Sequence, residues 1–170
     1  MPEAPDSNSI PTKILAPIDF SSSSHAALEM AADLAQHFSA ELYLVHVIPM
    51  FTTSTFPDFI PETKFLEAAR AQAETQFAAC KADLTSKGLK VNYSIEEGND
   101  VAGNIMDVID REHVDMVVIS THGITGWHPL VFGSIAEKVV KLAQCPLMLL
   151  RSAKPQTSAK VPSGRLMEWW

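Results

Sequence analysis

Two kinds of hydrophobic pattern alternate along this chain. Short apolar runs rich in β-branched residues are typical of strands buried on both faces, whereas apolar residues spaced three and four positions apart are typical of amphipathic helices. The runs predict strands at 13–19, 41–48, 90–98, 114–119 and 146–151. The spacing predicts helices at 26–38, 62–87, 100–112 and 134–143, and Gly88 is the natural stop for the second helix.

Strands that alternate with helices indicate a parallel sheet with right-handed crossovers. We therefore predict an α/β fold: a doubly wound, Rossmann-like, five-stranded parallel sheet in the order 3-2-1-4-5, with helices on both faces. The strand at 90–98 is the most polar and is predicted at an edge. In such sheets a ligand binds beyond the carboxyl ends of the strands where the strand order reverses, here between the first and fourth strands.

The length and composition suit one domain with its own core, since the chain has 170 residues and is 46% hydrophobic. We predict this domain over residues 12–152. Residues 1–11, with three prolines, are predicted to be a disordered arm, and residues 153–170 a flexible tail. The tail ends in Trp169-Trp170; it either has no role, docks on its own or a neighbouring subunit, or binds a partner.

Several classes of function are unsupported by the composition. The net charge is −7 and the basic residues are scattered, so no nucleic-acid partner is expected. No apolar stretch reaches the roughly 18 residues of a membrane span, and the N-terminal residues lack the apolar core of a secretory signal, so a cytoplasmic location is expected. Cys80 and Cys145 lie far apart without a CxxC spacing, which favours two reduced, mostly buried thiols over a zinc site or disulfide.

The fourth predicted strand leads into a loop of small residues and then into a helix. Ser120 follows the strand, Gly123 lies in the loop with nine residues between it and Gly133, and Ser134 opens the helix. Glycines let a ligand approach the backbone, and the unpaired amides and dipole at a helix start favour an anion. This pattern predicts a phosphate site, and Asp19, at the end of the first strand, would face the same crevice.

The pattern resembles the motif of nucleotide-binding universal stress proteins: glycine, two residues, glycine, nine residues, glycine, then serine or threonine. Here Ser120 replaces the first glycine. The resemblance extends over roughly residues 12–151 and includes Ala16-Pro17-Ile18-Asp19-Phe20-Ser21, Leu44-Val45-His46-Val47 and Cys145-Pro146-Leu147-Met148-Leu149-Leu150. From these residues, the chain resembles a universal stress protein of the ATP-binding type.

The resemblance implies that the chain binds ATP, or ADP or AMP, with Mg²⁺ held by the phosphates. It also implies a homodimer that pairs along the last strand, residues 146–151. By position, the adenosine would be bordered by Pro17, Ile18 and Asp19, and the adenine would meet the backbone of Val47. The ribose and phosphates would lie against Ile119 and Ser120, and the phosphate cradle would be formed by Gly123, Gly133, Ser134 and Ile135, with His122 as a further phosphate contact.

Two departures from the motif bear on affinity. Ser120 adds a side chain where glycine is usual, and Ile124 stands where Lys or Arg is common. Residues 120–136 contain no Lys or Arg, so phosphate binding would depend on backbone amides, Thr121, Ser134, His122 and a cation. We therefore expect micromolar affinity.

The same residues also have structural interpretations. Asp19 either contacts the ribose or a bound cation, or holds the first loop by an Asx-type bond or helix cap. Gly123 and Gly133 either cradle phosphate or serve a turn and helix packing, and Ser134 as a helix N-cap is compatible with both. His46 is interpreted as a structural histidine at a strand end. Residues 127–129 either cover the nucleotide or pack on the domain.

No catalytic motif is present: the sequence lacks a Walker loop, HExxH and GxSxG. We predict a cytoplasmic, dimeric nucleotide sensor in which the ligand orders residues 121–132 and an unidentified protein partner reads the change. One alternative is a weak, metal-dependent ATP hydrolase that uses Asp19. The other is a family member that has lost nucleotide binding through Ser120 and acts through protein contacts.

Overall fold

The computed structural model describes residues 10–50, 62–121 and 133–151. Strands and helices alternate along these ranges. In chain order they are β1 Lys13–Pro17, α1 Ser22–Phe38, β2 Glu41–Ile48, α2 Glu62–Ser86, β3 Val91–Glu97, α3 Val101–Glu112, β4 Met116–Ser120, α4 Ser134–Leu142 and β5 Leu147–Leu150. The predicted arm at 1–11 and tail at 153–170 lie almost wholly outside the described residues, so their disorder stays a prediction.

The strands form one parallel sheet in the order β3-β2-β1-β4-β5. This confirms the predicted strand order and the edge position of the polar strand β3. The other edge is β5, which pairs with β4 from Val117↔Leu147 to Ser120↔Leu150. The reversal of strand order therefore falls between β1 and β4, as the sequence predicts.

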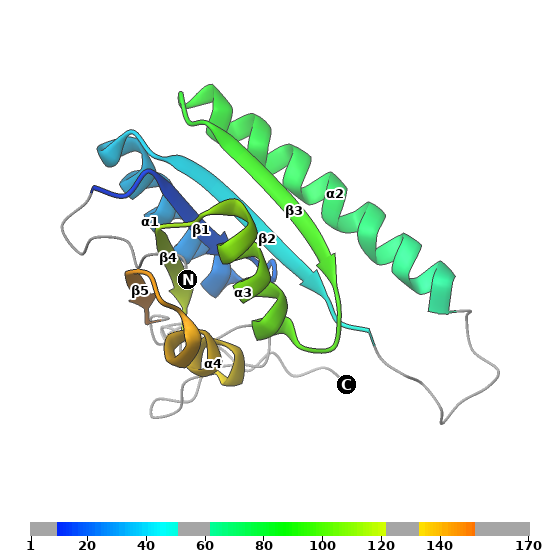
Figure 1. The fold of residues 1–170 in the computed structure, drawn as a ribbon. Helices are drawn as coiled ribbons and strands as arrows, with labels where there is room; N and C mark the ends of the chain where they lie inside the picture. The colour runs from blue at the N-terminus through cyan, green and yellow to red at the C-terminus, as the bar shows by residue number, and fades with distance from the viewer. Residues whose placement is uncertain (1–9, 51–61, 122–132, 152–170) are drawn as a thin grey trace, which may run out of the picture.

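Two helices cover each face of the sheet (Figure 1). One core contains residues of α1 and α2 packed on the strands and includes Ile14, Leu44 and Phe77. The other contains residues of α3 and α4 and includes Leu15 and Val117. Because successive strand residues point to opposite faces, neighbouring residues such as Ile14 and Leu15 belong to different cores, and both are fully buried.

Helix boundaries follow local capping. The hydroxyl of Ser21 accepts a hydrogen bond from the amide of Ser24 at 3.1 Å, so α1 begins at Ser22, four residues before the predicted start. Asp100 caps α3 through the amide of Gly103. Gly88 follows the end of α2 with φ of +85°, a left-handed conformation that favours glycine, which confirms its predicted role as the stop.

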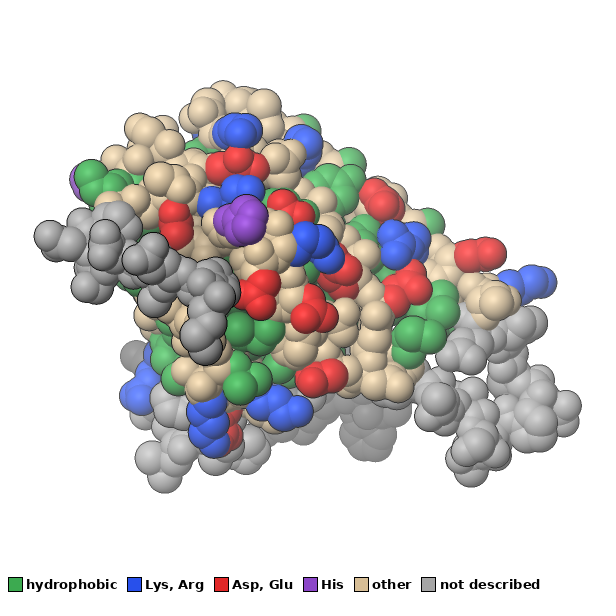
Figure 2. Space-filling model, in the orientation of Figure 1, with side chains coloured by type: hydrophobic (Ala, Val, Ile, Leu, Met, Phe, Trp, Pro, Cys, Tyr) green, Lys and Arg blue, Asp and Glu red, His purple; other side chains and the backbone are tan. Residues whose placement is uncertain are grey.

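The surface shows no separation of charge by sign on the α3 side: acidic and basic side chains are interspersed there (Figure 2). None of the helices in the described ranges has the length and apolar content that crossing a membrane requires. Both thiols are free and half-buried, somewhat more exposed than predicted, and burial raises the pKa of each.

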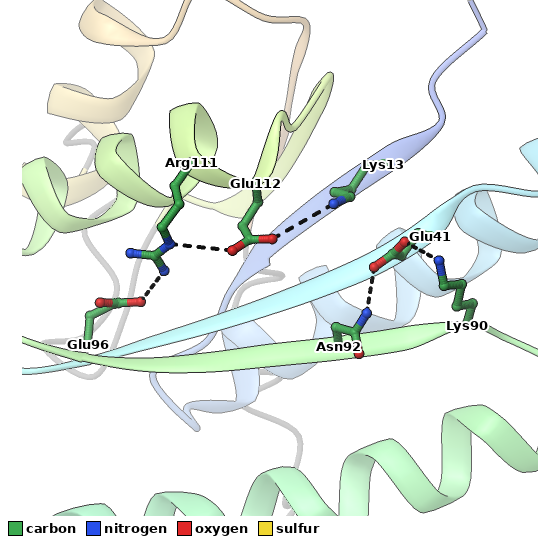
Figure 3. A network of polar contacts seen from close by, with 7 residues as sticks. All are labelled: Lys13, Glu41, Lys90, Asn92, Glu96, Arg111 and Glu112. Carbon is green, nitrogen blue, oxygen red and sulfur yellow. Dashed lines mark hydrogen bonds and ion pairs between the residues drawn. The ribbon is translucent and has the colours of Figure 1, made fainter.

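A set of ion pairs and hydrogen bonds links β1, β2, β3 and α3 (Figure 3). Glu41 is only 14% exposed; its carboxylate accepts hydrogen bonds from Lys90 Nζ and Asn92 Nδ2, each at 2.6 Å. The bond from Lys90 lowers the pKa of Glu41, against the opposing effect of burial. On the neighbouring α3, Arg111 binds Glu96 at 2.6 Å.

We expect Glu41→Gln to lower the free energy of unfolding at pH 7 by about 1 kcal/mol, because it removes the charge that Lys90 binds. The pKa of Glu41 is lower in the folded state, so this stability is present above the unfolded pKa of about 4.3 and is lost as the pH falls through the folded value. Urea unfolding between pH 7 and pH 3 should show the difference between the two proteins narrowing at acid pH. Asp83→Asn, which breaks an exposed ion pair with Lys87, should have little effect. If Glu41→Gln lowers the free energy of unfolding by the same amount at every pH, the charge of Glu41 is not what stabilises the protein.

Candidate functional site

The candidate site lies at the carboxyl ends of β1 and β4, where the strand order reverses. These strands are direct neighbours, in register from Ile14↔Met116 to Leu15↔Val117. The chain leaves β1 after Pro17 and β4 after Ser120, so the two following segments lie at the same edge of the sheet. β2 extends past them, since Pro17 pairs with Val45 and β2 continues through Val47 to Ile48.

Two hydrogen bonds fix Ile18, the first residue after β1, to the end of β2. Its amide donates to the carbonyl oxygen of Val45 at 2.8 Å, and its carbonyl oxygen lies 2.7 Å from His46 Nδ1. A carbonyl only accepts, so Nδ1 of His46 is the donor and carries the proton. The structural interpretation of His46 as a strand-end histidine is confirmed, and Ile18, at 3% exposure, has little freedom to move.

Asp19 and Phe20 form the next part of this turn. Oδ1 of Asp19 accepts hydrogen bonds from the amide of Ser21 at 3.0 Å and from its hydroxyl at 2.5 Å, which is the Asx-type bond of the structural alternative. Phe20 has a φ of +61°, a left-handed conformation that is strained for a phenylalanine. Its ring lies 4.7 Å from the His46 ring and 5.4 Å from the Phe77 ring, measured between centroids, and these contacts hold the strained backbone.

The segment after β4 is anchored at both ends. The amide of Thr121 donates to the carbonyl oxygen of Leu150 at 2.8 Å, and the amide of Gly133 donates to the carbonyl oxygen of Thr121 at 2.8 Å. The chain therefore returns at Gly133 to the point where it left the sheet. His122, Gly123, Ile124 and residues 127–129 lie outside the described residues.

The contact between Thr121 and Gly133 places the start of α4 beside the end of β4. Gly133 is the N-cap of α4 and makes no side-chain capping bond; Ser134 is the first helical residue and is exposed, so its interpretation as the N-cap is wrong. The first bond within the helix runs from the amide of Glu137 to the carbonyl of Gly133. The amides of residues 134–136 consequently have no acceptor within α4, as at every helix start. An anion at this position would meet those amides and the positive end of the helix dipole.

The structure brings most of the predicted site residues to one edge of the sheet. Ser120 is 9% exposed and Thr121 4%, whereas Ser134 and Ile135, which is 40% exposed, face outward at the first turn of α4. Within residues 10–50, 62–121 and 133–151, no three His, Cys, Asp or Glu side chains come together in a way that could hold a metal ion.

The family of the chain follows from comparison with known proteins. The model of the universal stress protein family matches residues 11–151. The chain belongs to this family. Among curated members, universal stress protein YxiE of Bacillus subtilis is 29% identical over 147 residues, which is 82% of this chain and 98% of the relative.

Solved universal stress proteins have the same fold as this family member. Hypothetical protein MJ0577 is 25% identical to this chain in sequence, and its structure matches with a TM-score of 0.75. The match covers 86% of this chain and 99% of the MJ0577 chain. A universal stress protein from Archaeoglobus fulgidus, solved in complex with dAMP, is 19% identical with a TM-score of 0.58; it covers 83% of this chain and 98% of its own. The family and the α/β fold that the sequence predicts are therefore both confirmed.

Proposed function

We propose that this universal stress protein binds an adenine nucleotide at the edge formed by β1, β4 and α4. The observation that carries the proposal is the hydrogen bond between Gly133 and Thr121, because it holds the uncapped start of α4 against the end of β4. A helix start next to the reversal of strand order suits a phosphate group. The dAMP complex of the Archaeoglobus fulgidus relative supports an adenine nucleotide as the ligand.

In this proposal the phosphates lie over the first turn of α4 and receive hydrogen bonds from the amides of residues 134–136 and from Ser134. His122 and Gly123 would complete the phosphate cradle with Gly133. The nucleoside lies toward β1 and β2, bordered by Pro17, Ile18, Asp19, Val47, Ile119 and Ser120. Mg²⁺ would be held mainly by the phosphates, because hard oxygen ligands suit it and it keeps several of its waters.

The proposed role is that of a sensor. Residues 122–132 connect two anchor points, Thr121 and Gly133, that both lie at the proposed phosphate position. A ligand that contacts these anchors would change the conformations open to the connecting residues, and a protein partner would read that change. The unpaired thiols of Cys80 and Cys145 suit the reducing cytoplasm as the place of action.

We further propose that the protein acts as a homodimer through β5. This strand is an edge of the sheet, and Leu149 on it is 36% exposed. On the adjoining α4, Val140 and Leu142 are 44% and 54% exposed. Apolar side chains beside an unpaired strand edge favour association with a second copy.

The proposal predicts saturable binding of ATP, ADP or AMP with a micromolar dissociation constant in calorimetric titration of the full chain with Mg²⁺. Heat extraction of the purified protein beforehand would identify any nucleotide carried along, and light scattering of the same sample would give the mass of two chains. Gly133→Val should abolish the binding, because a branched side chain fills the space at the helix start, and a thermal melt should show that this variant still folds. If no nucleotide binds and none is extracted, the proposal fails, and gain of binding in Ser120→Gly would then identify the serine as the cause.

A further inference from the structure

A groove runs between α1 and α2, on the face of the sheet opposite α3 and α4 and away from the candidate site. It has a volume of about 220 Å³. We call it the acidic groove and define it by Glu29 and Asp33 of α1, Cys80 and Asp83 of α2, and the buried residues Leu28 and Leu84. α1 packs mainly on β4 and β1, whereas α2 packs mainly on β3, and the groove lies between the two helices.

The acidic groove carries a negative charge. Glu29, Asp33 and Asp83 line it, and the cationic side chain among its lining residues is Lys87; three carboxylates and one ammonium give a net charge of −2. Lys87 is already bound to Asp83 at 2.7 Å. The hydrogen bond to Asp83, and to a smaller extent the charges of Glu29 and Asp33, raise the pKa of Lys87.

The size of the groove favours a side chain as its occupant. Pockets for small molecules usually have volumes of about 300–1,000 Å³, so 220 Å³ is small for a nucleotide or a similar ligand. A pocket of this size, with leucines beneath it and carboxylates at its rim, suits one large apolar side chain flanked by basic residues. Aromatic side chains seated in such pockets are the usual anchors of peptide and protein interfaces.

Residues 152–170 of this chain have the complementary chemistry. They contain Lys154, Lys160 and Arg165 against Glu168, which gives a net side-chain charge of +2, and they end in two adjacent tryptophans, Trp169 and Trp170. The segment follows β5 directly, and its 19 residues can extend over roughly 60 Å, enough to pass from β5 to the opposite face of the domain.

We propose that residues 152–170 dock in the acidic groove of their own chain, with one of the terminal tryptophans seated against Leu28 and Leu84 and the basic side chains paired with Glu29 and Asp33. A segment tethered to its site has an effective concentration on the order of 1 mM. Even a dissociation constant of about 0.1 mM for the isolated segment would therefore leave the groove occupied in roughly nine molecules of ten.

The thiol of Cys80 reports on this occupancy, because it lines the acidic groove and is half-buried. Cys145 is half-buried among the α3 and α4 residues on the opposite face and is the internal control. In the full chain under native conditions, the rate of modification by a thiol reagent would be measured for both cysteines by peptide mass spectrometry. Trp169→Ala with Trp170→Ala should raise the rate at Cys80 by roughly tenfold and leave the rate at Cys145 unchanged.

Charge reversal tests the pairing independently. Asp33→Lys with Glu29→Lys should expose Cys80, and so should replacement of Lys154, Lys160 and Arg165 by glutamate, while the two sets combined should restore protection. The proposal would be overturned if Cys80 were modified at the same rate in the parent and in the tryptophan variant. It would also be overturned if the combined variant did not restore the protection of Cys80. Protection that disappears on dilution would also overturn it, because the segment would then occupy the groove of a second copy.

Discussion

Phe77→Ala is expected to lower the free energy of unfolding by about 3–5 kcal/mol, the cost of removing a large aromatic side chain from a close-packed core. Phe77 on α2 is fully buried, and its ring centroid lies 5.4 Å from that of Phe20 and 4.8 Å from that of Tyr93. Its side chain therefore joins the first βα turn, α2 and the edge strand β3. Denaturant unfolding followed by circular dichroism would measure the loss, with an unchanged denaturant slope showing that the folded state stays compact.

Phe77→Leu is the matched control, because leucine keeps most of the apolar volume and should cost markedly less than alanine. Phe77→Ala should also weaken nucleotide binding, since the Phe77 ring is one of two that hold Phe20 in its left-handed conformation next to Asp19. A loss of stability below about 1 kcal/mol would mean that the core around Phe77 is loosely packed or collapses without cost.

Ser134→Asp is expected to change stability and nucleotide affinity in opposite directions. A carboxylate in the first turn of α4 interacts favourably with the helix dipole and should raise the free energy of unfolding by about 0.3–1 kcal/mol. The same charge would repel a phosphate placed at the helix start, at a cost of roughly 1.5–3 kcal/mol, which is a ten- to hundredfold loss of affinity. Thermal unfolding of the free protein and calorimetric titration with ATP would measure the two effects.

Ser134→Asn separates charge from shape, because asparagine matches aspartate in size and carries no charge. It should leave the affinity within a few-fold of the parent, and added salt should reduce the penalty of Ser134→Asp. If Ser134→Asp binds ATP as the parent does, the phosphates do not lie at the start of α4, and the proposed orientation of the nucleotide is wrong even if a nucleotide binds.

The strand order and the number of elements could be predicted from the sequence because the strongest patterns are local. The continuous run at 41–48 matches β2 residue for residue, and the helix at 62–87 ends one residue earlier than predicted. The ends of strands and helices are harder to predict where hydrogen bonds to distant residues determine them. β4 begins at Met116 rather than Val114, because the amide of Val114 bonds back to the carbonyl of Ile109 and Asp115 binds the amides of Thr12 and Lys13.

The geometry of the candidate site was less accessible from the sequence. The spacing of glycine and serine predicts the start of α4. The hydrogen bond from Gly133 to Thr121 cannot be predicted in this way, because it joins two residues separated by an 11-residue segment. The left-handed conformation of Phe20 cannot be predicted from the sequence, because phenylalanine carries no signal for it and its ring contacts, His46 and Phe77, are distant in sequence. Such contacts become visible only when the strands are assembled.

The bond that closes residues 122–132 at their two ends has a consequence for how such a protein can diversify. Because Thr121 and Gly133 are joined by backbone atoms, this contact does not require particular side chains between them. Doubling the length of a closed loop costs only about 0.6 kcal/mol of chain entropy. Residues 124–132 can therefore be exchanged or lengthened while His122 and Gly123 of the proposed cradle are kept, so that a descendant or an engineered variant could acquire a new recognition specificity on the same sheet.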